Sequence, residues 1–418
     1  MKLDNKKLLF LISLGSLLEY YDFGIYIFLA PLVGKSLIPA SSAWFNLFLS
    51  YSILAISALV RPLGGFIFAH LGDTRGRKYT FVYTILLMAV PTTCIAFIPS
   101  AHSIGIWAAV LLVFFRILQG FALGGEISGS IVFAYELSST QKKSFNTAMV
   151  IMGTNIGFFL ASSICTLFIG FQFQNIEGWR FAFLLGGLFG IVSYFMRKSL
   201  VETPTFTEYK RLLKQESAPL KLLLEKYKKP LFQMISIGCL LSSGLAVFNY
   251  YAPYYLSEFY HFPLQQLMKF NTYTILIFSV GSLLAGIFHQ WLGKKFFLCF
   301  VLTISMGSLL LFFNYGNLTL SQIFFFHSLL LLEIGIICGR YPVLIASFFP
   351  VSVRYSGVAF AHNIGFGIVA GCTQMILTWL IQVTGIIWVP ALYICFFTVL
   401  AMIALMTIRP KQMVEYQD

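Results

Sequence analysis

Charged residues are scarce in this sequence. Asp, Glu, Lys and Arg make up only 10% of its 418 residues, whereas 58% are hydrophobic, and the mean hydropathy is +0.84. Soluble domains carry about 25% charged and about 45–50% apolar residues. The shortage of charge therefore excludes an ordinary soluble domain. It indicates a polytopic membrane protein whose side chains mostly face lipid or pack between helices that do.

Features of catalysis and of metal binding are missing as well. The seven cysteines are odd in number, scattered through apolar segments and without the spacing of a metal site, so we interpret them as small buried side chains. No nucleophile elbow or phosphate-binding loop is present. The sequence thus predicts no enzymatic activity, no cofactor and no metal site.

A cleavable signal peptide is not expected, because the first apolar run is too long and lacks a small-residue cleavage site. Twelve apolar runs approach the roughly 20 residues that a membrane-spanning helix needs. The predicted spans are 8–33, 43–70, 79–99, 104–134, 144–170, 179–197, 229–255, 269–291, 296–313, 320–346, 356–382 and 385–408. A polar segment separates six spans from six. We expect an N-terminal six-helix bundle (1–198), a cytoplasmic central loop (199–228) and a C-terminal six-helix bundle (229–418).

Basic residues predict the orientation of these spans. Of the 28 lysines and arginines, 22 fall at the helix ends and loops on the same side as the N-terminus, against Lys35, Arg180 and Lys269 on the other. Because Lys and Arg are retained in the cytoplasm, both termini are expected there. The net charge of +13 then reflects contact with anionic inner-leaflet lipid, and no nucleic-acid partner is expected.

The two halves of the chain repeat each other. The loop AHLGDTRGRKYTF (69–81) aligns with GIFHQWLGKKFFL (286–298), so that Gly76 falls on Gly293. In a second pair of loops, Glu136 aligns with Ser347 and Lys143 with Arg354. Internal repeats of this kind are typical of transporters, whose substrate site lies near the bilayer midplane between the repeats.

The loop 69–81 resembles the signature of the major facilitator superfamily, a glycine followed by Asp and a Gly-Arg-Lys cluster. Asp73, Gly76, Arg77 and Lys78 fit that signature, whereas Ala69 replaces a glycine. The carboxylate of such a turn would accept donors from a helix end or an arginine and latch the inward gate. The alternative is that the loop carries topogenic charge and nothing more.

Further stretches resemble the metabolite:proton symporter family within that superfamily. They are EYYDF with Tyr26 (19–26), RPLGGFIFAHLGD (61–73), FRILQGFALGGEISGS (115–130), NYYAPYYLSE (249–258) and FFPVSVRYSGVAFAHN (348–363). The resemblance spans nearly the whole chain. It implies twelve helices in two bundles and proton-coupled transport of zwitterionic osmolytes or organic acids. Tyr20, Ser347, His362 and Gln374 depart from the family pattern.

Seven charged residues lie within the predicted helices, where lipid should exclude them: Glu19, Asp22, Arg61, Arg116, Glu126, Glu333 and Arg340. Such residues usually face the protein interior and mark an ion or substrate path. Glu19 and Asp22 share a helix face about 5–6 Å apart. Two such carboxylates cannot both ionise cheaply at low dielectric, so one of them is predicted to carry the coupled proton. A fixed ion pair that only locks helices together is the alternative.

Arg116 lies near midplane depth and offers a planar fork for a carboxylate. Gln119 follows one turn later on the same face. The sequence leaves open whether Arg116 binds substrate or holds Asp22. His327 aligns with Arg116 in the repeat and is interpreted either as a proton relay or as a packed side chain. Glu333 and Arg340 are expected to find partners on the fifth or eleventh span.

The aromatic run 248–255 is denser in tyrosine than packing requires, and Pro253 should break or bend its helix. Tyr254 and Tyr255 fit an interfacial aromatic belt, whereas Asn249 and Tyr250 lie deeper. The residues expected to bind substrate are Arg116, Gln119, Tyr26, Asn249 and Tyr250. The residues expected to form gates are Arg61, Asp73, Gly76, Arg77, Lys78, Glu126, Glu136 and Arg354.

These patterns predict a secondary active transporter of a bacterial inner membrane. It would take up a small organic acid or a proline- or betaine-like osmolyte with protons, by alternating access. A proton-coupled exporter of amphipathic compounds, a passive facilitator and a sensor that does not transport are the alternatives. The expected partners are the solute, protons and membrane lipid, and a monomer is expected.

Overall fold

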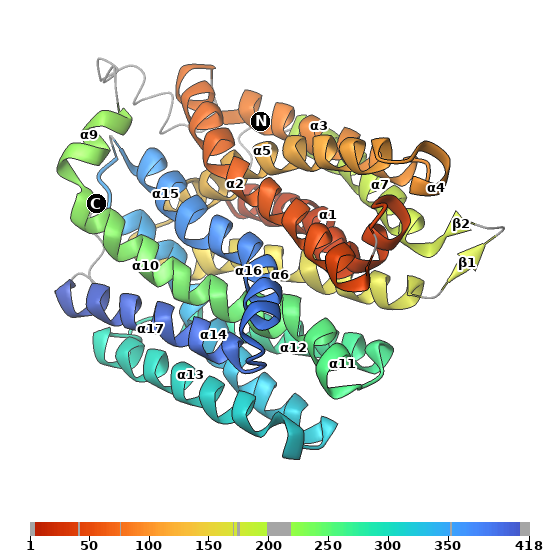
Figure 1. Ribbon diagram of the computed structural model, residues 1–418. Helices are drawn as coiled ribbons and strands as arrows, with labels where there is room; N and C mark the ends of the chain where they lie inside the picture. Colours follow the sequence, from red (N-terminus) through yellow and green to blue (C-terminus); the bar gives the residue numbers. More distant parts are fainter. Residues whose placement is uncertain are drawn as a thin grey trace.

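The computed structural model describes residues 5–40, 42–75, 77–169, 171–173, 176–198, 219–351 and 353–409. Almost all of these residues are helical (Figure 1). The long helices run side by side. The start of α1 and the end of α17 lie at one end of the molecule, whereas the short helix α4 and the β1–β2 hairpin lie at the other. We call these the terminal end and the hairpin end.

The N-terminal half contributes six long helices, which we call the N-terminal bundle. Its elements are α1 (Asn5–Leu37), α2 (Ala43–Arg75), α3 (Arg77–Ala96), the short α4 (Ala101–Ile104), α5 (Trp107–Glu136), α6 (Lys143–Phe168) and α7 (Gly178–Lys198). A single 3-10 turn (Thr140–Lys142) precedes α6. Between α6 and α7, strands β1 (Gln172–Phe173) and β2 (Ile176–Glu177) pair antiparallel, with Gln172 opposite Glu177.

The C-terminal half contributes the C-terminal bundle, in which two long helices contain a π-helical segment. Its elements are α9 (Pro219–Lys226), α10 (Lys228–Leu245), the π-helix η2 (Ala246–Tyr251), α11 (Ala252–Tyr260), α12 (Leu264–Ile287), α13 (Lys294–Asn314), the 3-10 turn η3 (Tyr315–Asn317), α14 (Leu320–Ser347), α15 (Arg354–His362), the π-helix η4 (Asn363–Ile368), α16 (Val369–Thr384) and α17 (Val389–Thr407). The runs α10–η2–α11 and α15–η4–α16 each form one continuous span.

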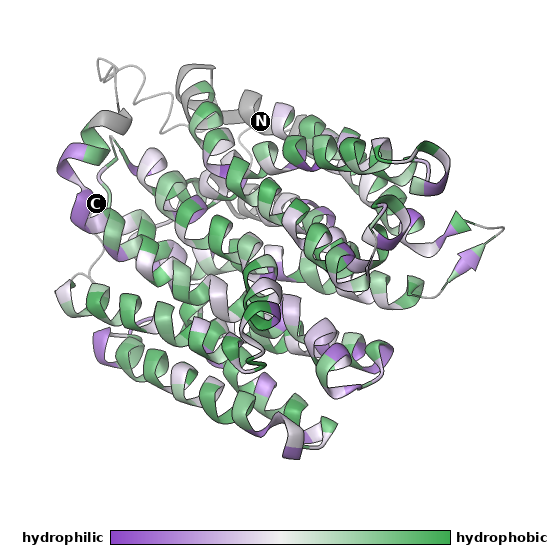
Figure 2. Ribbon diagram, viewed as in Figure 1, coloured by the Kyte–Doolittle hydropathy of each residue, from purple (hydrophilic) through white to green (hydrophobic). Residues whose placement is uncertain are grey.

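Among the described residues, eleven helices are long and apolar enough to cross a membrane, and the shorter apolar helix Val82–Ala96 lies where the third span is predicted. Figure 2 shows hydrophobic residues along these helices, with hydrophilic residues gathered at helix ends, α9 and the hairpin. The predicted all-α polytopic fold is therefore confirmed.

Glycines four residues apart let helices approach closely, as expected of small residues in membrane helices. A Cβ at Gly157 of α6 would lie 2.3 Å from the carbonyl oxygen of Leu17 in α1. A Cβ at Gly339 of α14 would lie 2.1 Å from the carbonyl oxygen of Ser282 in α12. These two contacts, one in each half of the chain, bring α6 against α1 and α14 against α12 at backbone distance. Close packing of these helices therefore depends on glycine at both positions.

The aromatic run does not break at Pro253. The α-helical hydrogen-bond ladder gives way to η2 just before it, and Pro253 then falls in the first turn of α11. Proline is tolerated there because its missing N–H would have had no intrahelical acceptor. The span therefore stays helical from Lys228 to Tyr260.

The two bundles meet along their central helices. In this interface α12 packs along α6, α16 packs along α2, and η4 contacts α2. Asn155 of α6 donates to Ser282 of α12 at 3.2 Å, and the hydroxyls of Ser162 and Thr272 are 2.7 Å apart. The buried charges described next lie on α1, α2 and α5, three helices that border this interface.

Candidate functional site

Two buried arginines lie close to one aromatic ring. Arg116 of α5 is 0% exposed and Arg61 of α2 is 2% exposed. The Cζ atoms of Arg116 and Arg61 lie 5.9 and 5.3 Å from the ring centroid of Phe23 in α1. Arg116 also lies over the ring of Tyr26, with its Cζ atom 4.0 Å from the centroid. These distances allow cation–π attraction, which helps to hold two like charges in a desolvated region.

Arg116 reaches Asp22 through two other side chains. Arg116 Nη1 donates to Gln119 Oε1 at 2.8 Å, and Gln119 Nε2 donates to Thr92 Oγ1 at 2.6 Å. The Thr92 hydroxyl in turn donates to Asp22 Oδ2. In the described part of the structure, Arg116 Nε and Nη2 and Asp22 Oδ1 have no hydrogen-bond partner. The arrangement leaves one edge of the guanidinium available to an added acceptor.

Glu19 and Asp22 are both buried, with 6% and 4% of their surface exposed, and they have different neighbours. Asp22 connects to Arg116 as above. Tyr20, next to Glu19, interacts electrostatically with both Glu19 and Arg61. Asp22 is thus connected to Arg116, whereas Tyr20 lies within electrostatic reach of both Glu19 and Arg61.

The π-helix η4 completes this region from the C-terminal bundle. A Cβ at Gly367 would lie 3.4 Å from Arg61 Nε, so the guanidinium rests against the η4 backbone. His362 interacts electrostatically with Arg61 and stacks on Phe366, with ring centroids 5.1 Å apart. Asn363 Nδ2 donates to the carbonyl oxygen of Gly124 in α5 at 2.7 Å. Sequence reasoning did not assign η4 to the site.

The two substrate candidates of the seventh span differ in what they contact. The Tyr250 ring is buried against Phe28 and Phe158 of the N-terminal bundle, at centroid distances of 6.3 and 5.3 Å. Asn249 Oδ1 instead accepts a hydrogen bond from Thr274 of α12 at 3.2 Å, within its own bundle. Tyr250, rather than Asn249, therefore contacts α1, the helix that carries Phe23.

Two of the gate candidates form an ion pair between the bundles. Glu136 Oε1, at the end of α5, lies 3.4 Å from Arg354 Nη1, at the start of α15. Arg354 Cζ lies 4.9 Å and Lys143 Nζ 4.6 Å from the centroid of the Tyr135 ring. Arg354 and Lys143 are equivalent in the repeat, so matching cations from both halves gather at this ring. The cluster lies at the terminal end.

The other gate candidates lie elsewhere. Arg61 lies in the central region described above. Glu126 Oε2 accepts a hydrogen bond from Thr84 of α3 at 2.5 Å. Gly76 and the side chains of Asp73, Arg77 and Lys78 lie outside the described residues.

Of the remaining helix charges, Arg340 Nη1 donates to Ser144 Oγ of α6 at 3.1 Å, which confirms the expected partner on the fifth span. The expectation for Glu333 is wrong. Its carboxylate accepts a hydrogen bond from Thr303 of α13 at 2.9 Å, because its position on α14 faces α13.

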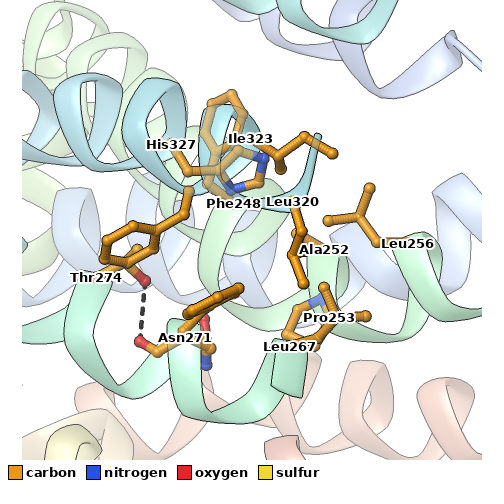
Figure 3. A pocket seen from close by; sticks show the side chains of 12 residues that line it. Phe248, Ala252, Pro253, Leu256, Leu267, Asn271, Thr274, Leu320, Ile323 and His327 are labelled. Atoms are coloured by element: carbon orange, nitrogen blue, oxygen red, sulfur yellow. Dashed lines mark hydrogen bonds between the residues drawn. The ribbon is translucent and has the colours of Figure 1, made fainter. Parts of the chain in front are cut away.

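His327 lies inside the C-terminal bundle (Figure 3). Its Nε2 is 2.5 Å from the Tyr315 hydroxyl, and its ring packs edge-on against Phe248. It lines a cavity of about 30 Å³ together with Asn271 and Thr274, room for one or two water molecules. These contacts all belong to the C-terminal half, so His327 is placed apart from the acid–arginine groups.

Known proteins resemble this chain in sequence and in fold. The family described as Major Facilitator Superfamily matches residues 12–362. The glycine betaine/proline/ectoine/pipecolic acid transporter OusA of Dickeya dadantii is 30% identical over 94% of this chain and 81% of its own length. The proline/betaine transporter of Escherichia coli is also 30% identical, over 95% of this chain and 82% of its own length.

The fold matches that of solved symporters. A crystal structure of a D-xylose-proton symporter superposes with a TM-score of 0.75 at 16% identity, covering 98% of this chain and 99% of that one. A partially occluded, inward-open xylose transporter XylE from E. coli gives a TM-score of 0.74 at 16% identity, covering 96% and 97%. At this identity the match concerns the fold alone. The chain belongs to the major facilitator superfamily, as its loop and helix motifs predicted, and is a membrane transporter rather than an enzyme.

Proposed function

We propose that the protein takes up a small zwitterionic solute of the proline or betaine type together with protons, across the inner membrane of a bacterium. The names of the curated relatives support this solute class. The observation that carries the proposal is the burial of two arginines near Phe23, together with the buried acids Glu19 and Asp22 of the same helix and the relay that joins Asp22 to Arg116.

The charges of this group give a physical reason for coupling. Arg61 and Arg116 balance Glu19 and Asp22 when both acids are ionised. Protonation of one acid leaves the group with one excess positive charge in a region of low dielectric, which a substrate carboxylate would neutralise. Since an unpaired buried charge is costly, the proton and the carboxylate each favour binding of the other. This reciprocity is what a symporter requires.

We assign the proton to Asp22 and the substrate carboxylate to Arg116. The Thr92–Gln119 relay makes the hydrogen bonding of Arg116 depend on the state of Asp22. Glu19 then remains as the fixed counter-charge of Arg61. Tyr26 and Phe23 offer ring faces beside Arg116, and Tyr250 contributes the wall from the C-terminal bundle.

Alternating access would proceed by rocking of the two bundles (1–198 and 229–418) about this region, with 199–228 as the cytoplasmic connection. The terminal end is held shut by the Glu136–Arg354 pair, by Asn363 and by the Tyr355 hydroxyl, which donates to the carbonyl oxygen of Gly125 at 2.9 Å. The lysine and arginine distribution supports a cytoplasmic terminal end. On this reading the described state is closed to the cytoplasm.

Reconstitution into liposomes tests the proposal. With an inward proton gradient, we expect accumulation of glycine betaine or proline above the external concentration, and alkalinisation of the medium when solute is added. Oxoglutarate, citrate and shikimate complete the panel. Arg116→Lys is the matched control, because a point charge replaces the planar fork. Equilibration without accumulation would indicate a facilitator, and proton-driven efflux of amphipathic compounds would indicate an exporter.

A further inference from the structure

A second cavity, separate from the charges around Phe23, lies at the hairpin end between the two bundles. It has a volume of about 370 Å³. Residues of α1 and α2 line it on the N-terminal side, and residues of α11, α12 and α16 on the C-terminal side. This volume lies within the range of small-molecule sites, about 300–1,000 Å³.

The lining of this cavity combines one charge of each sign with aromatic surface. Lys35 comes from the last turn of α1, and Glu258 comes from α11 of the opposite bundle. Trp44, Tyr251 and Tyr254 add ring surface. An anion in the cavity would meet Glu258, and a cation would meet Lys35. A small zwitterion can satisfy both charges, and its ammonium group can also lie against the rings.

Aromatic contacts form a floor between this cavity and Phe23. The Tyr254 hydroxyl donates to the carbonyl oxygen of Phe28 at 2.7 Å, and the Tyr250 ring packs against the Phe28 ring. The cavity and the arginine region are thus separate places in this state. A solute bound in the cavity would have to pass these rings to reach Arg116.

Buried polar groups without partners lie beyond the floor. In the described part of the structure, the Tyr51 hydroxyl and both side-chain amide atoms of Gln374 have no hydrogen-bond partner, although both residues are 0% exposed. The Tyr51 ring lies 6.2 Å from the ring of the lining residue Tyr251. Gln374 lies one turn from the lining residue Thr378, whose hydroxyl donates to its carbonyl oxygen at 2.8 Å. These groups offer hydrogen bonds to a solute moving inward.

We propose that this cavity is an entry site that binds the zwitterionic solute before it reaches the central arginines. The solute carboxylate pairs with Lys35, and its ammonium group lies toward Glu258 and the tyrosine rings. The inference rests on the proposed function, which supplies the solute class and makes the hairpin end the outer one.

Protection of an engineered cysteine tests this site. Gln382 lines the cavity, and Gln382→Cys can be labelled from outside with a membrane-impermeant maleimide in right-side-out vesicles. The protein with its native cysteines gives the background. Phe173→Cys, on the exposed β1–β2 hairpin, is the matched control outside the cavity. Glycine betaine should slow labelling at position 382 several-fold and leave position 173 unchanged.

The decisive experiment repeats the labelling in a protein that also carries Arg116→Lys, which disables the proposed central site. Protection by betaine should persist there, and should be lost when Lys35→Gln or Glu258→Gln is added. If Arg116→Lys abolishes protection, the cysteine reports only the central site and the entry site is refuted. If protection survives both Lys35→Gln and Glu258→Gln, the proposed recognition of the solute by these two residues is refuted.

Accumulation in liposomes keeps the two proposals distinguishable. Protection without accumulation would contradict symport and retain the entry site. Accumulation without protection would overturn the entry site alone.

Discussion

At the scale of single residues, the unusual feature is the burial of two guanidinium groups around one phenylalanine. Cation–π contacts contribute about 0.5–2 kcal/mol each, which is less than the several kcal/mol needed to desolvate an ion. Phe23 alone therefore cannot stabilise Arg61 and Arg116. The nearby carboxylates must supply the rest, so any change in their charge alters what the arginines can bind.

Replacing the two acids separately should give different defects. Asp22→Asn imitates the protonated acid, so we expect gradient-driven accumulation to be lost while exchange of internal for external solute survives. Glu19→Gln removes the proposed counter-charge of Arg61, so we expect accumulation and exchange both to fall. Uptake and counterflow in the same liposome preparations would measure this. If both variants still concentrate solute, Asp22 and Glu19 are not the coupling groups.

The relay through Thr92 can be tested with an isosteric change. Thr92→Val removes the hydroxyl that connects Gln119 to Asp22, and losing a buried hydrogen bond to a charged group costs about 1.5–3 kcal/mol. We expect solute affinity to fall about 10- to 100-fold, with Thr92→Ser restoring most of it. Thr93→Val is the control, because the Thr93 hydroxyl donates to the Ala89 carbonyl within its own helix, α3. Equal affinity in the Thr92 and Thr93 variants would argue against the relay.

Some of these residues could be predicted from the sequence and others could not, for a physical reason. Glu19, Asp22 and Arg116 stand out because lipid excludes charge, so their presence needs an explanation. Thr92 does not stand out, since a threonine in an apolar helix normally bonds to a carbonyl one turn back, and the Met88 carbonyl oxygen, 2.9 Å from Thr92 Oγ1, competes with Asp22 for its one proton. Its second role depends on which helix lies opposite, and sequence does not supply that.

At the scale of elements, η2 and η4 break the α-helical pattern where the C-terminal bundle faces the N-terminal one. π-Helical segments are uncommon and occur often at functional sites. η2 carries Tyr250 toward Phe28 and Phe158, and η4 carries Gly367 against Arg61. The helical spans were predictable from apolar runs. The π-segments were not, because they arise from how two bundles fit together.

Side-chain size at position 367 should control Arg61. A Cβ there would make ordinary contact with Arg61, at 3.4–3.5 Å, so Gly367→Ala should transport nearly as well as the parent protein. Gly367→Leu adds branches that must push the guanidinium away from η4, and we expect transport to be largely lost while the protein still folds. Size-exclusion profiles would monitor folding. Full activity of the leucine variant would show that Arg61 does not need this position.

At the scale of the whole molecule, the two ends differ. The terminal end holds an ion pair between the bundles and two hydrogen bonds that cross the same interface, whereas the hairpin end holds a cavity between them. Glycine-mediated contacts within each bundle keep its helices at backbone distance, so each half can move as a unit. The contacts between the halves are then the ones that change when the bundles rock. Among these contacts, the Glu136–Arg354 pair can be tested directly by substitution.

Breaking that pair should shift the molecule toward opening at the terminal end. Both side chains are largely buried, 11% and 5% exposed, so Glu136→Gln should cost about 1.5–3 kcal/mol in the described state and change the ratio of states about 10- to 100-fold. Labelling of Gln382→Cys from the hairpin end should slow accordingly, because fewer molecules present that cavity. The exchanged pair Glu136→Arg with Arg354→Glu should recover part of the labelling rate, since it restores opposite charges at the same contact. An unchanged rate in Glu136→Gln would mean that Asn363 and Tyr355 hold the terminal end closed without the ion pair.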